Sequence, residues 1–243
     1  MRLRAVTFDF WSTLVDGAVT PASTARRVAK LHAAIVGAGH ACSVSEVDRA
    51  YATLMARLDD TQFEATEEVG PPGRWAVLAA ALGVPDGLIA FEVIEKAYED
   101  ITLNPLPPLM PYVGSAVDAM RSAGYRLGVI CNTGMAGGGV LREVLRQHGL
   151  LDGFDVLTFS NEFGVPKPQP AIFRHTLEEL GSVAPSEALH VGDMEHLDVL
   201  GARRAGLHSA LYAPYAAKKV ETEADIVVRD WREFVAQIAE LVG

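Results

Sequence analysis

Short apolar runs alternate with amphipathic segments over most of the chain. The apolar runs have the length and composition of strands that are buried on both faces of a parallel sheet. They lie at residues 3–10, 125–131, 154–160, 188–191, 208–212 and 225–228. Helical periodicity fills the intervals, at residues 114–123, 140–148, 171–180, 198–205 and 231–242. Strands alternating with helices predict an α/β fold with a doubly wound, Rossmann-like parallel sheet.

A long stretch between the first two apolar runs has a different pattern. Helical periodicity dominates residues 21–103, and no strand pattern occurs there. The proline-rich segment at residues 105–111 closes this stretch. The sequence therefore predicts two domains. An α-helical cap domain covers residues 16–105, and the α/β core domain is made of residues 1–15 and 106–243.

Local signals within this stretch predict individual helices. Residues 43–46 (SVSE) have the pattern of a capping box, and an amphipathic helix follows them. Pro71-Pro72-Gly73 predicts a break in the chain, with a helix after it at residues 75–82. Asp86 is a suitable N-cap for a further helix that reaches residue 98.

Composition narrows the class of protein. The chain has 243 residues, of which 49% are hydrophobic and 21% charged, so it predicts a globular fold. Its net charge of −10 excludes a general basic surface for nucleic acid. No apolar stretch is long enough for a membrane span, and no signal-peptide pattern occurs. The two cysteines form no metal-binding or redox pair. We expect a cytoplasmic protein, a monomer or homodimer.

Polar residues cluster where four of the predicted strands end. The carboxyl ends of parallel strands meet at one edge of an open sheet, and ligands bind there. Each cluster has an ordinary explanation by itself, such as a turn or a helix cap. Together they would bring carboxylates, an amide and a lysine to one edge. The residues are Asp9, then Cys131, Asn132 and Thr133, then Lys167, and finally Asp193 and Asp198.

Such a set suits chemistry on an oxyanion. A carboxylate can act as a covalent nucleophile and split one difficult displacement into two steps. It approaches a phosphate dianion only when cations neutralise the charge. A Mg²⁺ ion held by oxygen ligands and the ammonium of Lys167 would provide that neutralisation.

The ordered set resembles the haloacid dehalogenase-like hydrolase superfamily. The resemblance covers essentially the whole core, and residues 16–103 lie where this family inserts a helical cap. The matching segments are FDFWSTL at 8–14, VICNT at 129–133, KP at 167–168, VGD at 191–193, DV at 198–199 and GA at 201–202.

The resemblance implies a role for each matching position. Asp9 would be the nucleophile and a metal ligand, and the backbone carbonyl of Trp11 a second metal ligand. Asp193 would bind Mg²⁺, with Asp198 assisting directly, through water, or by a hydrogen bond to Lys167. Lys167 would steady the nucleophile and the transferred group. Cys131, Asn132 and Thr133 would lie at the substrate.

Three positions depart from the phosphatases of the family. Trp11 occupies the place of the aspartate that protonates the leaving alcohol, a contribution of about 10²–10⁴ in rate. Cys131 replaces a Ser or Thr and is a weaker hydrogen-bond donor. Met194 replaces a small polar residue.

These departures leave three hypotheses open. The first is Mg²⁺-dependent hydrolysis of a small phosphate monoester through an Asp9 intermediate. The second is a metal-independent 2-haloacid dehalogenase with an Asp9 ester, because a halide leaves without a proton. Asp193 beside Asp9 speaks against it, since two carboxylates repel each other without a cation. The third is a weakly active or non-catalytic member that binds a phosphorylated ligand.

Four other residues are secondary candidates. His196 lies between Asp193 and Asp198 and is either a substitute acid–base group or a loop histidine. His190 is expected to be a packed, hydrogen-bonded core residue. Arg74 and Trp75 either face the substrate or are a surface charge and a core aromatic. The glycines at 137–139 predict a loop or helix start, without the spacing of a nucleotide-binding motif.

Overall fold

A six-stranded parallel sheet forms the centre of the computed structural model, which describes residues 3–61, 67–216 and 220–242. All neighbouring strands are parallel, in the order β3-β2-β1-β4-β5-β6. The predicted α/β fold with a doubly wound sheet is confirmed. The strands are β1 (Ala5–Phe8), β2 (Arg126–Cys131), β3 (Val156–Phe159), β4 (Ala188–Gly192), β5 (His208–Tyr212) and β6 (Ile226–Val228).

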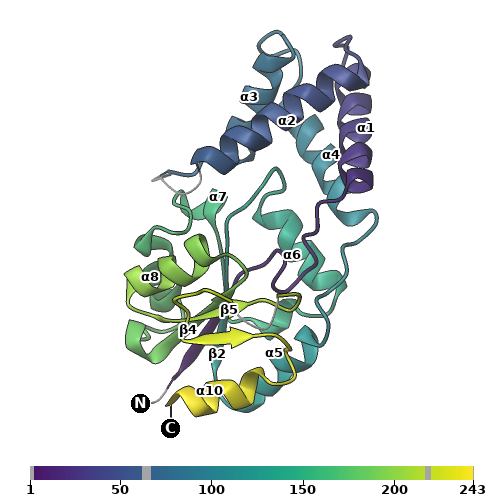
Figure 1. The fold of residues 1–243 in the computed structure, drawn as a ribbon. Coiled ribbons are helices and arrows are strands. Elements are labelled where there is room, and N and C mark those ends of the chain that lie inside the picture. Colours follow the sequence, from purple (N-terminus) through teal and green to yellow (C-terminus); the bar gives the residue numbers. More distant parts are fainter. Residues whose placement is uncertain (1–2, 62–66, 217–219, 243) are drawn as a thin grey trace.

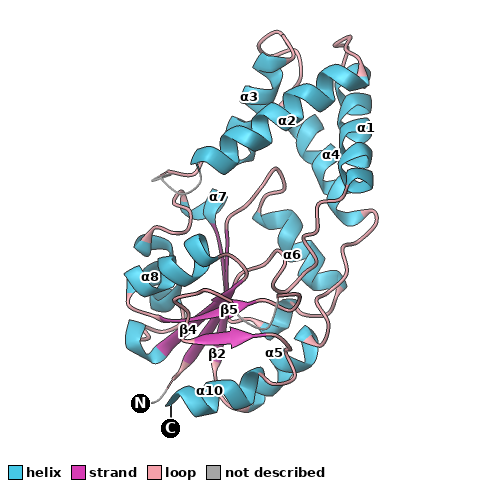
Figure 2. Cartoon of the chain, in the orientation of Figure 1, coloured by secondary structure: helices cyan, strands magenta, loops and turns pink. Residues whose placement is uncertain are grey.

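Helices cover both faces of this sheet, which explains why its strands are apolar throughout (Figures 1 and 2). One face packs against α5 (Val113–Ser122), α6 (Gly138–Gln147) and α10 (Phe234–Val242). The other packs against α8 (Pro170–Glu179) and α9 (Leu200–Ala205). Between these elements lie four short helices. They are η1 (Leu151–Gly153), α7 (Ser160–Phe163), η2 (Pro185–Glu187) and the π-turn η3 (Glu195–Val199).

Strand β1 lies between β2 and β4, where the winding of the sheet reverses. After β1 the chain builds β2 and β3 on one side, and it then returns to build β4, β5 and β6 on the other. The connections on the two sides diverge at this point, so a crevice opens at the carboxyl ends of β1 and β4. Side chains that directly follow these two strands therefore share one site.

The described residues of the helical insertion, which runs from residue 21 to 103, form four helices between β1 and β2. They are α1 (Pro21–Gly37), α2 (Val44–Thr61), α3 (Gly70–Ala81) and α4 (Phe91–Leu103). Figure 1 shows them grouped apart from the sheet. Their buried apolar residues form a separate cluster, which includes Leu31, Leu78 and Ile94. The domain boundaries at residues 15–16 and 105–106 stay a prediction.

The capping box at the start of α2 is present. The backbone N–H of Ser43 donates to Glu46 Oε2 at 2.7 Å, and the N–H of Glu46 donates to Ser43 Oγ at 3.3 Å. These bonds satisfy two donors that the first turn of a helix leaves unpaired.

The helix boundaries differ from the sequence prediction at three places. Pro71-Pro72-Gly73 does not break the chain but lies in the first turn of α3, where a missing N–H costs no hydrogen bond. Helix α4 begins after Ala90 rather than at Asp86, because Gly87 adopts a positive φ of 73° in the intervening turn. Residue 198 lies in η3, ahead of α9. Among the described residues, no helix is both long and apolar enough to cross a membrane.

Candidate active site

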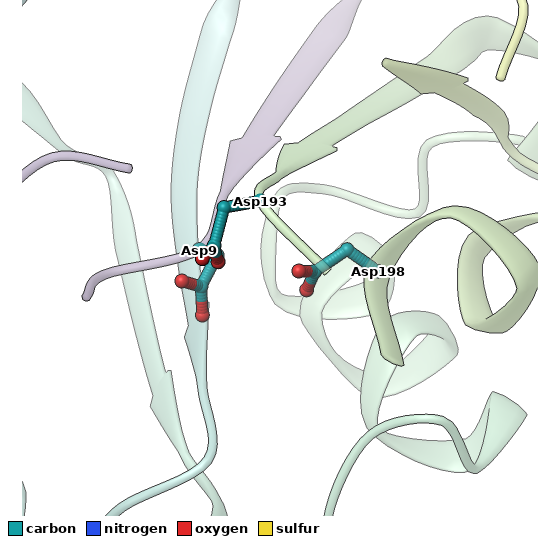
Figure 3. A group of neighbouring side chains, drawn as sticks. All are labelled: Asp9, Asp193 and Asp198. Carbon is teal, nitrogen blue, oxygen red and sulfur yellow. The ribbon is translucent and has the colours of Figure 1, made fainter. Parts of the chain in front are cut away.

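Three carboxylates meet at the carboxyl ends of β1 and β4. Asp9 follows β1, Asp193 follows β4, and Asp198 lies in η3 (Figure 3). One oxygen from each lies within 4.8 Å of the others. Asp9 and Asp198 are buried, whereas Asp193 is partly exposed. The structure thus brings together the three acidic residues that the strand-end pattern singled out.

A buried lysine joins two of these carboxylates. The Nζ atom of Lys167 donates to Asp9 Oδ1 at 2.5 Å and to Asp198 Oδ1 at 2.7 Å. Only 1% of the Lys167 side chain is exposed, so little water screens the two ion pairs. Such a lysine stays charged because the carboxylates surround it. Among the three options for Asp198, the geometry shows the hydrogen bond to Lys167.

Asn132 fixes the backbone that carries this lysine. Its Nδ2 donates to the carbonyl of Lys167 at 2.9 Å, and its Oδ1 accepts from the Lys167 N–H at 2.7 Å. Both hydrogen-bonding groups of the amide therefore contact the backbone of Lys167. The loop after β2 thereby holds the segment after β3 in register with Asp9.

Asp198 is held by further donors. His190 Nε2 lies 3.2 Å from Asp198 Oδ1, and its Nδ1 lies 2.9 Å from Thr7 Oγ1. The N–H of Met194 donates to Asp198 Oδ2 at 3.0 Å. His190 is fully buried, as expected for a packed, hydrogen-bonded core residue. This series of contacts links β1, β4 and η3 beneath the carboxylates.

Burial and mutual repulsion set the protonation of the acids. Burial, with the nearby Asp198 charge adding to it, raises the pKa of Asp9 to about 6 despite Lys167. Burial and then the Asp9 and Asp198 charges raise the pKa of Asp193 to about 7. Burial also opposes the charge on Asp198, but Lys167 and His190 outweigh it and hold that pKa well below its usual range. Asp9 and Asp193 thus keep their protons to a higher pH than free aspartic acids do.

Gly192 permits the close approach of Asp198. A Cβ atom at this position would lie 2.2 Å from Asp198 Cγ, well inside any real contact distance. Any side chain at residue 192 would therefore displace Asp198 from Lys167. The sequence pattern drew attention to the aspartates but missed this steric requirement.

The turn after β1 presents Trp11. Ser12 has a positive φ of 57°, and the N–H groups of Leu14 and Val15 both donate to the Phe10 carbonyl at 3.0 Å. Among the described residues, no backbone N–H donates to the Trp11 carbonyl. This oxygen is the predicted second metal ligand. The indole of Trp11 is half-buried and lines a cavity next to the site.

Residues of the loop after β2 form hydrogen bonds with one another and with the segment after β3. Cys131 is buried, and its Sγ donates to the Asn132 carbonyl at 3.4 Å. Burial raises the pKa of its thiol, and the Asp9 charge adds to this effect, so the sulfur is a neutral group here. The N–H of Thr133 donates to Ser160 Oγ at 2.9 Å. Ser160 was missed from the sequence, although it directly follows β3, where a polar residue at a strand end is a signal.

The secondary candidate residues have different environments in the structure. Trp75 is a buried core aromatic of the helical insertion. The interpretation of Arg74 as a surface charge is wrong, because only 11% of its side chain is exposed. It pairs with Glu68 Oε1 at 2.8 Å and donates to the carbonyl of Thr133. Arg74 thus connects the helical insertion to the loop after β2. His196 is half-buried in η3, and its acid–base role stays a prediction.

A cavity of about 400 Å³ lies between the helical insertion and the carboxyl ends of the strands. Trp11 and residues 134–136 contribute to it from the core, and all four helices of the insertion contribute from the other side. Its volume falls within the usual range for small-molecule sites. The loop after β2 lines this cavity and also carries Asn132, which makes it a suitable place for a substrate.

The residues present fit a divalent cation. Mg²⁺ prefers oxygen ligands from carboxylates and carbonyls, and Asp9, Asp193 and the Trp11 carbonyl supply these types. Burial is the main cause of the raised pKa values of Asp9 and Asp193, and neighbouring carboxylate charges add to it. A cation bound by these carboxylates would offset both effects.

Comparisons with known proteins identify a family whose model matches most of the chain. A family model described as haloacid dehalogenase-like hydrolase matches residues 3–206. The glyceraldehyde 3-phosphate phosphatase of Methanopyrus kandleri is 32% identical over 215 residues, or 84% of this chain and 82% of that protein. The haloacid dehalogenase-like hydrolase domain-containing protein 3 of Mus musculus is 33% identical over 131 residues. That match covers 54% of this chain and half the length of the relative.

Solved structures support the fold. A structure titled 2-haloacid dehalogenase from Pseudomonas syringae pv. Tomato DC3000 superposes with a TM-score of 0.72 and 23% identity. The superposition covers 98% of this chain and 99% of that one. At this identity the likeness concerns the fold and does not select a reaction.

Proposed function

The chain belongs to the haloacid dehalogenase-like hydrolase family, and on that premise we propose that it is a Mg²⁺-dependent phosphatase. Its substrate would be a small phosphate monoester, and Asp9 would be the nucleophile. The observation that carries this proposal is the contact of Lys167 with both Asp9 and Asp198, beside the partly exposed Asp193. The phosphatase name of the Methanopyrus kandleri relative supports the same reaction class.

In the proposed reaction each of these residues has one task. An Asp9 carboxylate oxygen forms a bond to phosphorus while the bond from phosphorus to the ester oxygen breaks. Water then attacks the aspartyl phosphate, which releases phosphate and restores Asp9. Lys167, held by Asn132 and Asp198, orients Asp9 and balances the charge that develops on the phosphoryl group. Mg²⁺ at Asp9, Asp193 and the Trp11 carbonyl would neutralise the remaining phosphoryl charge.

Trp11 determines which esters such an enzyme can cleave. An indole supplies no proton to a leaving alkoxide, so the proton comes from solvent and esters of acidic alcohols react faster. The same residue favours a second candidate, a 2-haloacid dehalogenase. In that reaction Asp9 would attack the carbon that bears the halogen and form an ester, and the halide would leave without a proton. The position of Asp193, with an oxygen within 4.8 Å of one from Asp9 and one from Asp198, supports a cation site and speaks against this alternative.

Two assays on the same protein separate the candidates. We expect hydrolysis of p-nitrophenyl phosphate with Mg²⁺, loss of that hydrolysis in EDTA, and no chloride release from 2-chloropropionate. Chloride release that survives EDTA, without phosphatase activity, would establish the dehalogenase instead. Inactivity in both assays, with phosphate binding retained, would identify a non-catalytic member.

A further inference from the structure

The loop after β2, residues 132–137, contacts both the reaction centre and the helical insertion. At its start, Asn132 forms two hydrogen bonds with the backbone of Lys167, the lysine that contacts Asp9. Further along, Met135 is only 7% exposed and belongs to the apolar cluster of the insertion. A displacement of the insertion would therefore act on the loop that holds the lysine.

Arg74 on α3 attaches the insertion to this loop. Its Nη1 donates to the carbonyl of Thr133, and its Nη2 donates to Glu68 Oε1 at 2.8 Å. The N–H of Thr133 donates to Ser160 Oγ at 2.9 Å, on the side of the core. The residue that directly follows Asn132 is thus held by the core through its N–H and by the insertion through its carbonyl.

Glu68 attaches the insertion at a second point. The N–H of Glu68 donates to the carbonyl of Gly164 at 2.9 Å, and Gly164 lies shortly before Lys167 in the segment after β3. The N–H of Gly70 donates to Glu68 Oε1 at 2.9 Å. The pair of Arg74 and Glu68 therefore contacts the two segments that Asn132 joins.

Burial makes this pair resistant to rearrangement. The side chains of Arg74 and Glu68 are 11% and 4% exposed, so their charges lie largely out of water. Separation of the two would leave a buried charge unpaired, which is strongly unfavourable. The guanidinium reaches its two partners with different nitrogens, so its fork also fixes the direction of the Thr133 carbonyl.

We propose that Arg74, together with Glu68, is a positioning residue for Lys167. The pair fixes the loop after β2 relative to the segment after β3, and Asn132 transmits this placement to Lys167 and so to Asp9. This inference rests on the proposed phosphatase activity for its effect on the rate, but the coupling between Arg74 and Asn132 can be measured without turnover.

The kinetic test uses the double variant Glu68→Gln, Arg74→Gln, which removes both charges and leaves neither one unpaired. With p-nitrophenyl phosphate and Mg²⁺ we expect kcat to fall about 10- to 100-fold, because Lys167 is misplaced. KM should change by less than about twofold, because Arg74 is not expected to contact the substrate. A raised KM with an unchanged kcat would overturn the positioning role and identify a substrate contact. An unchanged kcat and KM would overturn it as well.

Two further variants complete this test. Arg74→Lys keeps the charge but replaces the fork by one ammonium, so we expect a smaller loss of kcat in the same direction. It keeps the proposal testable if the double variant does not fold. Arg142→Gln is the control, because Arg142 forms an ion pair with Glu162 on α7, and these side chains are 37% and 41% exposed. It should leave kcat unchanged, and a loss equal to that of the double variant would overturn the proposal.

The test without turnover follows the side-chain amide of Asn132 by NMR. The chain has three asparagines, Asn104, Asn132 and Asn161, so selective ¹⁵N labelling of asparagine gives three pairs of side-chain signals. The Asn132 pair is identified by its loss in Asn132→Ser. We expect this pair to shift in the double variant and in Arg74→Lys, and to stay in place in Arg142→Gln.

This measurement separates the coupling from the reaction. Shifted Asn132 signals in a protein that hydrolyses no phosphate ester would mean that the proposed reaction fails and the coupling stands. Asn132 signals that stay in place in both Arg74 variants would overturn the coupling, whatever the effect on activity.

Discussion

The edge of the sheet and the cavity of the helical insertion differ in whether their charged groups have partners of opposite charge. At the edge of the sheet, Lys167 contacts two carboxylates, and Asn132 holds the backbone that carries it. In the cavity, Arg27 has no acidic partner and the Tyr98 hydroxyl has no partner within the described chain. The first region is organised in the absence of substrate, as a reaction centre requires. The second leaves the charge of Arg27 unbalanced by any carboxylate of the described residues. Substitutions in the two regions should therefore have different effects.

The largest effect is expected for Asp9→Asn, which tests the edge of the sheet. An amide is a poor nucleophile, so we expect phosphatase activity to fall by about 10⁴-fold or more. The protein should remain folded, because Asn has nearly the same size and shape as Asp. Steady-state kinetics and calorimetry on one preparation measure both effects. Residual activity above a few per cent would show that Asp9 is not the nucleophile.

Trp11→Asp tests both regions at once, because Trp11 lies two residues after Asp9 and also lines the cavity. The new carboxyl group would supply the missing acid, and we expect the rate on alkyl phosphates to rise by about 10²–10⁴. The rate on p-nitrophenyl phosphate should change less, because that leaving group needs no proton. Trp11→Asn is the matched control, since it removes the indole without adding an acid. An equal gain from Trp11→Asn would show that the rate rises because the indole is removed and not because an acid is added.

Lys167→Met tests the organisation of the sheet edge by stability. Removing one partner of a buried ion pair leaves the carboxylates uncompensated, and we expect a loss of about 3–5 kcal/mol in the free energy of unfolding. Urea denaturation measures it. Lys96→Met on α4 is the control, because Lys96 is exposed and should change stability by less than about 0.5 kcal/mol. Similar losses in the two variants would mean that the Lys167 contacts contribute little to the folded state.

Most of the fold could be predicted from sequence because strands buried on both faces leave a simple apolar pattern. All six strands and the helical insertion follow from that pattern. The boundaries of α3 and α4 did not follow, because they depend on local geometry. The prolines at residues 71–72 fit the first turn of a helix as well as a break, and the positive φ of Gly87 delays α4.

The sequence predicts the residues at the edge of the sheet but not those of the cavity. Asp9, Lys167, Asp193 and Asp198 each follow a strand, so the topology alone brings them to one edge. Arg27, Tyr51 and Tyr98 lie on three helices of the insertion, and their meeting depends on how those helices pack. No spacing in the sequence encodes that packing.

The smallest expected effect concerns pH and separates the acids at the sheet edge from the arginines of the cavity. The pKa values of Asp9 and Asp193 are raised to about 6 and about 7. Between about pH 4 and pH 7, the folded metal-free protein therefore holds protons that the unfolded chain has released. Its stability should rise as the pH falls from about 8 to about 5. Below about pH 4 it should drop again, because protonation of Asp198 would weaken the contact with Lys167.

Mg²⁺ should reverse this trend, because the ion competes with the same protons. We expect the gain in Tm from Mg²⁺ to be larger at about pH 8 than at about pH 6, by about 2–4 °C, the shift that 1 kcal/mol produces in a chain of this size. Calorimetry in EDTA and in Mg²⁺ measures the difference. Asp193→Asn should reduce the dependence on pH, whereas Arg27→Gln should leave it in place because Arg27 does not titrate in this range. A gain from Mg²⁺ that is equal at both pH values would mean that the ion does not bind at these carboxylates.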